Sequence, residues 1–219
     1  NMTKILLVTF CTLLTSFLWS VDFIYLDSIN GEDLESRSTI IQDESGTGYL
    51  LTSDDKVRNM NHRIRLNEKM ETLEWYFEEG EDRIRIERKG DVLCVTGLRD
   101  GKDITMDCPI DNAPWYASMD TGLSFFSKTQ DKEVEFWTIS PEELKTWKMI
   151  AKKKGTETWK AGEVSDTALR VQVSASGIPA LFFSMNFLMR QSDGLRLRFE
   201  GKTGGPGSPK MISNFVRME

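Results

Sequence analysis

Apolar and polar residues alternate with a period of two through most of the chain after residue 21, and this pattern constrains the fold most. Leu73, Trp75 and Phe77 alternate with charged or polar residues, and Ile84 and Ile86 repeat the pattern. A period of two is typical of strands that bury one face. Asn-Gly, Asp-Gly and Ser-Asp-Gly turns separate the alternating segments, and turns this short join antiparallel neighbours. The sequence therefore predicts a mainly β protein with one meandering antiparallel sheet of about ten or eleven strands.

Composition fits a single globular domain and narrows the range of partners. The chain has 219 residues, of which 39% are hydrophobic and 28% charged, and its net charge is −6. A chain of this length can bury a large core without disulfides or metals. No Lys/Arg-rich patch is present beyond Lys152–Lys154. We therefore predict no nucleic-acid partner, because binding to phosphates needs clustered positive charge.

His62 is the only histidine of the chain. A Ser-His-Asp triad or a zinc site with several histidines is therefore excluded unless it uses His62. A catalytic base also needs an orienting carboxylate and a nucleophile, and the sequence places neither beside His62, which we interpret as a surface strand residue. We predict that the protein is not an enzyme and that it holds no metal and no cofactor.

Residues 1–20 differ from the rest of the chain. Asn1 precedes Met2 and is interpreted as a cloning remnant. Lys4 and the uncharged run 5–19 then match the n-region and the h-region of a secretory signal peptide. Ser20 stands at the expected cleavage edge, although Leu18 departs from the small-x-small pattern. A buried N-terminal strand or helix is the alternative. We predict a signal-peptide-like segment over 1–20, a single β-rich domain over 21–219, and an exported, periplasmic protein.

Export would place Cys94 and Cys108 in an oxidising compartment, where they could form a disulfide. Asp100-Gly101 predicts a two-residue hairpin turn that sets Arg99 opposite Lys102. In that register Cys94 faces Asp107, and the two cysteines lie on opposite faces of the hairpin. We therefore predict two free, buried thiols. The alternative is a bulged turn that places both cysteines on one face, diagonally and beyond the usual bridging distance.

Two segments break the alternation. Ser140-Pro141-Glu142-Glu143 forms a capping box that predicts a helix ending near Gly155, and a strand through Trp147-Lys148-Met149-Ile150-Ala151 is the alternative. Local signals favour the helix. The segment 113–127 is expected to form a short helix or a lid.

The run from Leu181 to Met189 is the most informative stretch for function. On a strand, Phe183, Met185 and Phe187 share one large apolar face with the two ends of the run. One interpretation is a core face covered by a helix. The other is the wall of a ligand site in a curved sheet, because Met and Phe side chains adapt to irregular apolar groups. Both interpretations stay open at this point.

The order of the elements resembles a known group of proteins. The segments that carry the resemblance are Trp115-Tyr116, Phe136-Trp137-Thr138-Ile139-Ser140-Pro141, Lys154-Gly155-Thr156-Glu157-Thr158, Ala168-Leu169-Arg170-Val171, Ser192-Asp193-Gly194, Phe199-Glu200-Gly201 and Gly204-Gly205-Pro206-Gly207-Ser208-Pro209. Over most of residues 22–216 the chain resembles bacterial exported proteins of unknown function whose fold is similar to the LolA/LolB lipoprotein-carrier half-barrel. The resemblance implies a sheet curled around one or two short helices with an apolar concave face. It also favours the strand over the helix for residues 144–152.

From these observations we predict a non-enzymatic, exported binding protein that holds a lipid or another apolar ligand on the concave face and contacts the membrane surface transiently. The predicted apolar wall comprises Trp75, Phe77, Trp115, Phe183, Met185 and Phe187. The alternative is a structural or protein-interaction module of the cell envelope, which would bind a partner protein through a sheet edge or the loop 201–209.

Overall fold

The fold is seen in a computed structural model that describes residues 20–43, 46–56, 59–161, 164–177, 184–202 and 209–219. These residues form fourteen strands and one helix. The elements are β1 (Ser20–Ile29), β2 (Glu32–Gln42), β3 (Gly48–Asp55), β4 (Met60–Asn67), β5 (Thr72–Glu79), β6 (Asp82–Lys89), β7 (Val92–Arg99), β8 (Lys102–Pro109), α1 (Met119–Lys128), β9 (Glu133–Ile139), β10 (Thr146–Ala161), β11 (Val164–Ala175), β12 (Met185–Arg190), β13 (Arg196–Lys202) and β14 (Lys210–Met218).

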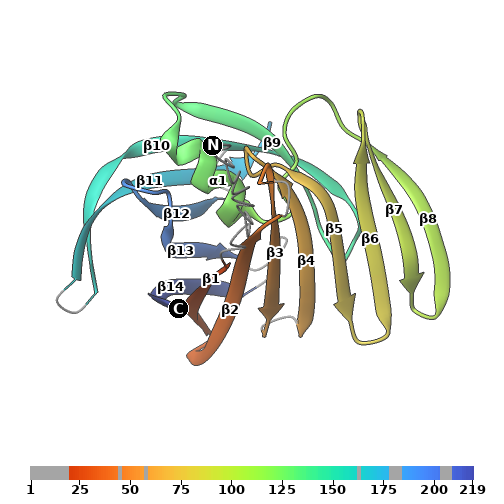
Figure 1. Cartoon of the computed structure of the whole chain (residues 1–219), viewed down its shortest axis with the longest axis horizontal. Helices are drawn as coiled ribbons and strands as arrows, with labels where there is room; N and C mark the ends of the chain where they lie inside the picture. The colour runs from red at the N-terminus through yellow and green to blue at the C-terminus, as the bar shows by residue number, and fades with distance from the viewer. Residues whose placement is uncertain (1–19, 44–45, 57–58, 162–163, 178–183, 203–208) are drawn as a thin grey trace, which may run out of the picture.

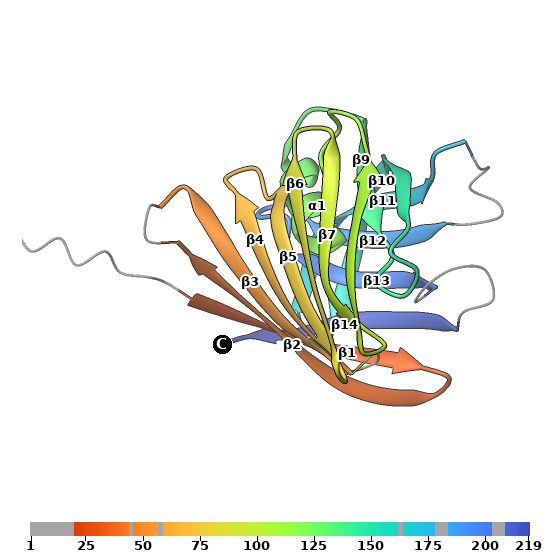
Figure 2. The ribbon, with the colours of Figure 1, turned by 90° about the vertical axis from the view of Figure 1, so that its right-hand side faces the viewer.

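All fourteen strands belong to one antiparallel sheet, as the sequence predicts for the class of fold. Their order is β8-β7-β6-β5-β4-β3-β2-β1-β14-β13-β12-β11-β10-β9. The first and last strands of the described residues, β1 and β14, therefore pair in the middle, and β8 and β9 form the two edges. Figures 1 and 2 show that the sheet curves strongly around α1 without closing into a barrel. The half-barrel and the short helix that the resemblance implies are confirmed.

The sheet has more strands than the ten or eleven expected. One addition is β10, where local signals favour a helix, and another is β14, whose residues show no clean alternation. The prediction of a helix from Ser140 is wrong. Glu143 N–H does donate to Ser140 Oγ (3.2 Å) and Leu144 N–H to the Ser140 carbonyl (2.8 Å), but this makes a single turn. Pairing with β9 and β11 then holds the chain extended, as the resemblance implies.

The hairpin of β7 and β8 follows the predicted register. Arg99 pairs with Lys102, Cys94 with Asp107 and Leu93 with Cys108. Because neighbouring residues of a strand point to opposite faces, the two cysteine side chains diverge. Both thiols are free; Cys108 is buried, whereas Cys94 is half-buried rather than buried as predicted. Burial raises the pKa of the Cys108 thiol, which lowers its reactivity.

Helix α1 lies against the concave side and is fitted closely to it. Gly122 is buried in the helix interior, and a Cβ atom there would enter the ring of Tyr116. We expect Gly122→Ala to lower the free energy of unfolding by about 1–2 kcal/mol, although alanine is the better helix former by about 1 kcal/mol. Thermal unfolding checks this result, with the exposed Lys128→Ala as the control. A stabilised Gly122→Ala variant would show that α1 is not packed on Tyr116.

Candidate functional site

The apolar concave face is divided into two clusters. The first, called the Trp75 cluster, gathers buried side chains of β3 to β8 with Trp115, Ile139 and Leu144. Trp75 and Phe77 lie side by side on β5, with ring centroids 4.7 Å apart. The structure thus brings together three of the predicted wall residues, because Trp115 packs in the same cluster.

The second, called the Phe187 cluster, lies on the other half of the sheet beneath α1. Met185 and Phe187 of β12 pack there with Leu123 and Phe126 of the helix, and the Phe187 ring lies 5.0 Å from that of Phe199. Phe183 lies outside the described residues. The five described wall residues are each at most 6% exposed. The described part of the predicted wall is therefore covered in this structure.

Buried and half-buried polar residues lie where α1 meets the central strands, and we call them the Arg196 group. Arg196 Nη1 forms an ion pair with Asp120 Oδ2 of α1 (3.0 Å), and Nη2 donates to Ser213 Oγ (2.9 Å). Its guanidinium also lies over the Tyr25 ring, 3.9 Å from the centroid. Asp27 is buried and acts electrostatically on Arg196. One cation thus serves two carboxylates at the end of the helix that covers the apolar face.

The electrostatics of the Arg196 group reflect its burial. Burial raises the pKa of Asp120, and the charge of Arg196 opposes that shift. Burial likewise raises the pKa of the Tyr25 hydroxyl. Burial lowers the pKa of Arg196, but Asp120 and the neighbouring groups outweigh it, so the pKa is raised and the guanidinium stays charged. Arg196 Nε is fully buried and has no hydrogen-bond partner among the described residues.

Sequence reasoning did not find the Arg196 group. Simple alternation along β13 places Arg196 with Arg198 on a polar face opposite Leu197. The register shifts at this point, because Leu188 pairs with Arg198 while Met189 pairs with Arg196. This bulge turns Arg196 toward α1. The sequence carries no signal of this, because an arginine that alternates with apolar residues is equally typical of a surface strand.

The segment 110–117 links the two halves of the sheet. Trp115 and Trp137 form a parallel bridge, and Thr72 N–H donates to the Trp115 carbonyl (2.9 Å). Asp111 fixes the start of the segment: its carboxylate accepts hydrogen bonds from Lys148 Nζ (2.6 Å) and Trp137 Nε1 (2.8 Å). Trp115 Nε1 is buried and has no hydrogen-bond partner among the described residues.

Asp111 predicts a measurable pH dependence. The hydrogen bond from Lys148, followed by that from Trp137, holds the pKa of Asp111 well below its usual range. A carboxylate with a lowered folded-state pKa stabilises the protein above its unfolded pKa of about 3.9, and this contribution is lost as the pH falls below that value. We expect Asp111→Asn to be less stable than the wild type near neutral pH, with the difference shrinking in acid. Denaturant unfolding at several pH values measures it, and a difference that grows in acid would contradict it.

His62 is not the surface residue that the sequence predicts. Its side chain is 11% exposed, and its ring packs on Trp75 and Phe77 at the border of the Trp75 cluster. Trp75 Nε1 donates to His62 Nδ1 (3.0 Å), and Asp55 Oδ2 lies 4.0 Å from Nε2. The difference arises because His62 shares the inner face with Ile64, two residues further along β4. His62 therefore lies at the border of the Trp75 cluster and accepts the hydrogen bond of the Trp75 indole.

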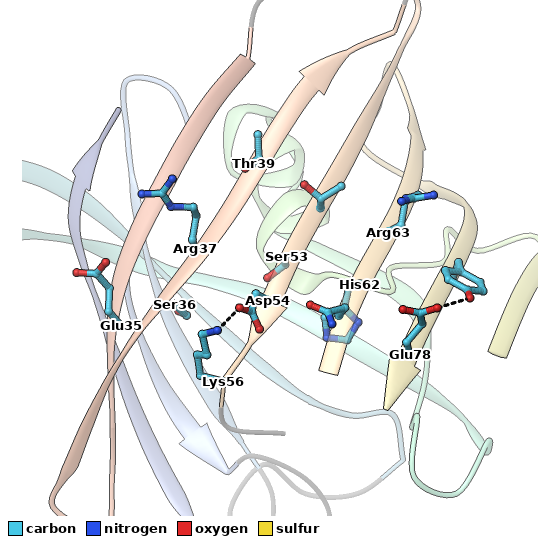
Figure 3. Close-up of a pocket in the computed structure, with 13 residues that line it drawn as sticks. Glu35, Ser36, Arg37, Thr39, Ser53, Asp54, Lys56, His62, Arg63 and Glu78 are labelled. Atoms are coloured by element: carbon cyan, nitrogen blue, oxygen red, sulfur yellow. Dashed lines mark hydrogen bonds and ion pairs between the residues drawn. The ribbon is translucent and has the colours of Figure 1, made fainter. Parts of the chain in front are cut away.

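The outer face of β2 to β5 carries a polar hollow of about 630 Å³. Figure 3 shows Arg37 of β2, Asp54 of β3 and Glu78 of β5 on this face. Its charges are mixed, and several are paired within it: Lys56 with Asp54, and Tyr76 Oη with Glu78 Oε1 (2.7 Å). The hollow is thus a solvated polar surface, whereas the apolar surface lies on the concave side.

No family model matches the sequence, and no curated protein matches it either. Solved structures align with the chain to different degrees. A β-barrel-like protein of the domain of unknown function DUF1849 from Brucella abortus aligns with a TM-score of 0.61 and 12% identity, covering 92% of this chain and 98% of that chain. The hypothetical lipoprotein YmcC from Escherichia coli aligns with a TM-score of 0.36 and 9% identity, covering 91% and 87%. A LolA superfamily protein from Nitrosomonas europaea aligns with a TM-score of 0.28 and 6% identity, covering 92% and 85%.

The first of these similarities shows the fold. The chain is an open antiparallel half-barrel with one helix among the described residues, and the DUF1849 protein shares this fold, so the resemblance to proteins of unknown function is confirmed at the level of the fold. Within the described residues, no helix is long and apolar enough to cross a membrane.

Proposed function

We propose that the protein is an exported bacterial binding protein that holds a lipid or another apolar ligand against the concave face of its sheet. The observation that carries the proposal is the cover of that face: two apolar clusters line it, and the single helix of the described residues packs over one of them. Such a cover can be displaced as a unit, whereas a second sheet could not. The Phe187 cluster contains Met119, Met149, Met185, Met189 and Met211, whose flexible side chains adapt to apolar groups of irregular shape.

Two unpaired donors narrow the chemistry of the ligand. Trp115 Nε1 and Arg196 Nε are both buried and lack an acceptor among the described residues. A buried donor without a partner costs about 1–3 kcal/mol. A ligand that carries oxygen acceptors, such as the ester or carboxyl group of a lipid, would supply what these donors lack. A pure hydrocarbon would not. This supports an amphipathic ligand over a purely apolar one.

Native mass spectrometry tests the proposal. Protein mixed with a phospholipid or a long-chain fatty acid should form a one-to-one adduct, and the lipid should displace a bound hydrophobic dye. We expect Met185→Gln on the inner wall to weaken the adduct and Leu73→Gln on the exposed surface to leave it unchanged. Circular dichroism confirms that both variants fold. A folded wild-type protein that takes up neither lipid nor dye would contradict the proposal.

Export and a periplasmic location are part of the proposal, and they depend on residues 1–20, of which 1–19 lie outside the described residues. The mass of the N-terminus of the natively expressed protein tests them. Cleavage near Ser20 is expected, and an uncleaved cytosolic chain would contradict export without affecting the test of lipid binding. The second candidate function, a protein-interaction module of the envelope, is supported by the edge of β8, beside which no further strand lies among the described residues.

A further inference from the structure

The free edge of the sheet at β8 has backbone groups available for pairing. In the β7–β8 hairpin, Arg99 and Lys102 close a two-residue turn, so residues with even numbers in β8 bond to β7. The hydrogen bond from Ile110 N–H to the Asp91 carbonyl continues this phase. The N–H and C=O groups of Asp103, Thr105 and Asp107 therefore point outward. Figure 1 shows β8 as the outermost strand at this end of the sheet.

The opposite edge differs, because it is partly covered. Trp137 N–H of β9 donates to the Pro114 carbonyl (2.8 Å), and Tyr116 N–H donates to the Trp137 carbonyl (2.9 Å). Within the described residues, no backbone hydrogen bond of this kind covers the outward groups of β8. The edge of β8 is therefore the one at which an added strand would meet the longer unpaired row.

Side chains along β8 define the chemistry of a matching strand. Asp103 and Asp107 are exposed on one face of the hairpin, paired with Leu98 and Cys94. On the other face Met106 is 39% exposed at the border of the Trp75 cluster, beside the half-buried Ile104. An added strand with basic residues on the first face and apolar residues on the second would pair with both rows.

The charge near the start of β8 also favours a basic partner strand. A hollow of about 600 Å³ at this corner is lined by five carboxylate residues, Glu79, Glu81, Asp82, Asp100 and Glu142, and by the single cation Arg99. Arg99 already binds Asp82 and the carbonyl of Pro141. The five carboxylates outnumber Arg99 and its neighbour Lys102, so the corner carries a net negative charge that would attract a basic segment.

A second copy of the chain fits this edge poorly. Two β8 strands paired antiparallel about Thr105 would set Asp103 of each copy opposite Asp107 of the other, and like charges directly opposite are destabilising. We propose that the β8 edge binds an extended basic segment of another protein, which adds as an antiparallel strand with alternating basic and apolar side chains. This inference does not depend on lipid binding.

A labelled peptide of alternating lysine and valine tests the proposal by fluorescence anisotropy. Saturable binding is expected, which a glutamate-for-lysine peptide does not show and which added salt of about 0.5 M weakens. Hydrogen exchange should slow in the peptide that spans residues 103–107 when the lysine peptide is bound. A peptide that fails to bind, or that protects another strand, would overturn the proposal.

Two variants separate backbone pairing from charge. Thr105→Pro removes an outward N–H without removing a bond to β7 and should weaken binding at least about tenfold. Asp103→Lys combined with Asp107→Lys should do the same, while Glu68→Lys with Asp131→Lys, which changes net charge equally, should have little effect. If Thr105→Pro does not fold, the lysine pair decides. Equal weakening by both charge pairs, or a wild-type dimer that Thr105→Pro dissociates, would overturn the basic-strand assignment.

Discussion

Replacing Arg196 by alanine should lower the free energy of unfolding by about 3 kcal/mol, which for a chain of this size corresponds to a fall in Tm of about 6–12 °C. The side chain of Arg196 is 10% exposed and forms an ion pair with Asp120. Removing one partner of a buried ion pair typically costs 3–5 kcal/mol, because the other charge stays buried without compensation. The lower end of this energy range applies to Arg196→Ala, because the side chain of Asp120 is 34% exposed and water partly stabilises its carboxylate.

A double-mutant cycle shows whether this loss comes from the pairing. Asp120→Asn removes the charge that Arg196→Ala leaves behind, so the double variant should be more stable than the sum of the two single effects predicts. Arg198→Ala is the matched control: Arg198 lies two residues away on β13, its side chain is 34% exposed, and it donates to Asn214 Oδ1 (3.0 Å). We expect it to cost less than about 1 kcal/mol. Additive effects of Arg196→Ala and Asp120→Asn would contradict the pairing.

Trp115→Ala should have a comparable or larger effect, about 4 kcal/mol. The Trp115 side chain is fully buried in the Trp75 cluster, so its loss leaves a cavity that the surrounding strands cannot fill. The segment that carries it also joins β5 and β9 through the backbone. Urea unfolding measures the change in stability. A loss below about 1 kcal/mol would show that Trp115 is not part of the core.

Trp115→Phe separates packing from the unpaired donor. Phenylalanine keeps most of the apolar surface and removes Nε1–H, which has no partner among the described residues. Because an unpaired buried donor is itself unfavourable, we expect Trp115→Phe to change stability by less than about 1.5 kcal/mol. Under the proposed function the same variant should bind an ester-bearing lipid more weakly than the wild type does. A severe loss of stability would indicate that Nε1 is already satisfied in the folded protein.

The parts of the fold that depend on local sequence could be predicted. The Asp100-Gly101 turn fixes the β7–β8 register because a two-residue loop leaves no freedom in the pairing. The shared face of Trp75 and Phe77 could also be predicted, because residues two apart on a strand point to the same side. Residues 140–155 could not, because the capping box at Ser140 is satisfied by a single turn, and pairing with β9 and β11 outweighs local helix propensity.

Two β-bulges explain why alternation along the strands did not predict the inward positions of Thr72 and Arg196. On β5, Arg65 pairs with Glu74 but Leu66 pairs with Thr72, so the expected inner residue Leu73 is 39% exposed and Thr72 is buried instead. Thr72 then accepts a hydrogen bond from Ala117 N–H at Oγ1 (2.9 Å). The bulge on β13 turns Arg196 inward in the same way. A single inserted residue reverses every side chain beyond it, and a pattern of period two carries no signal of where that happens.

Long-range pairing explains the remaining difference. Nothing in the spacing of strands indicates that β1 pairs with β14, which places the ends of the described chain in the middle of the sheet. This pairing separates the wall residues into the Trp75 and Phe187 clusters, with the Arg196 group between α1 and the central strands. The sequence could thus predict an apolar inner face, but the covering of that face by α1 depends on contacts between distant segments.

Photo-crosslinking with a lipid that carries a diazirine in its acyl chain tests the central claim most directly. After irradiation, mass spectrometry of the digested protein locates the label. The proposed function predicts label on the inner wall, in peptides that contain Trp75, Phe77 or Phe187, and faster hydrogen exchange in α1 when the lipid is bound. Label confined to the exposed Leu34, Val216 or Met218, with unchanged exchange in α1, would contradict a ligand site on the concave face.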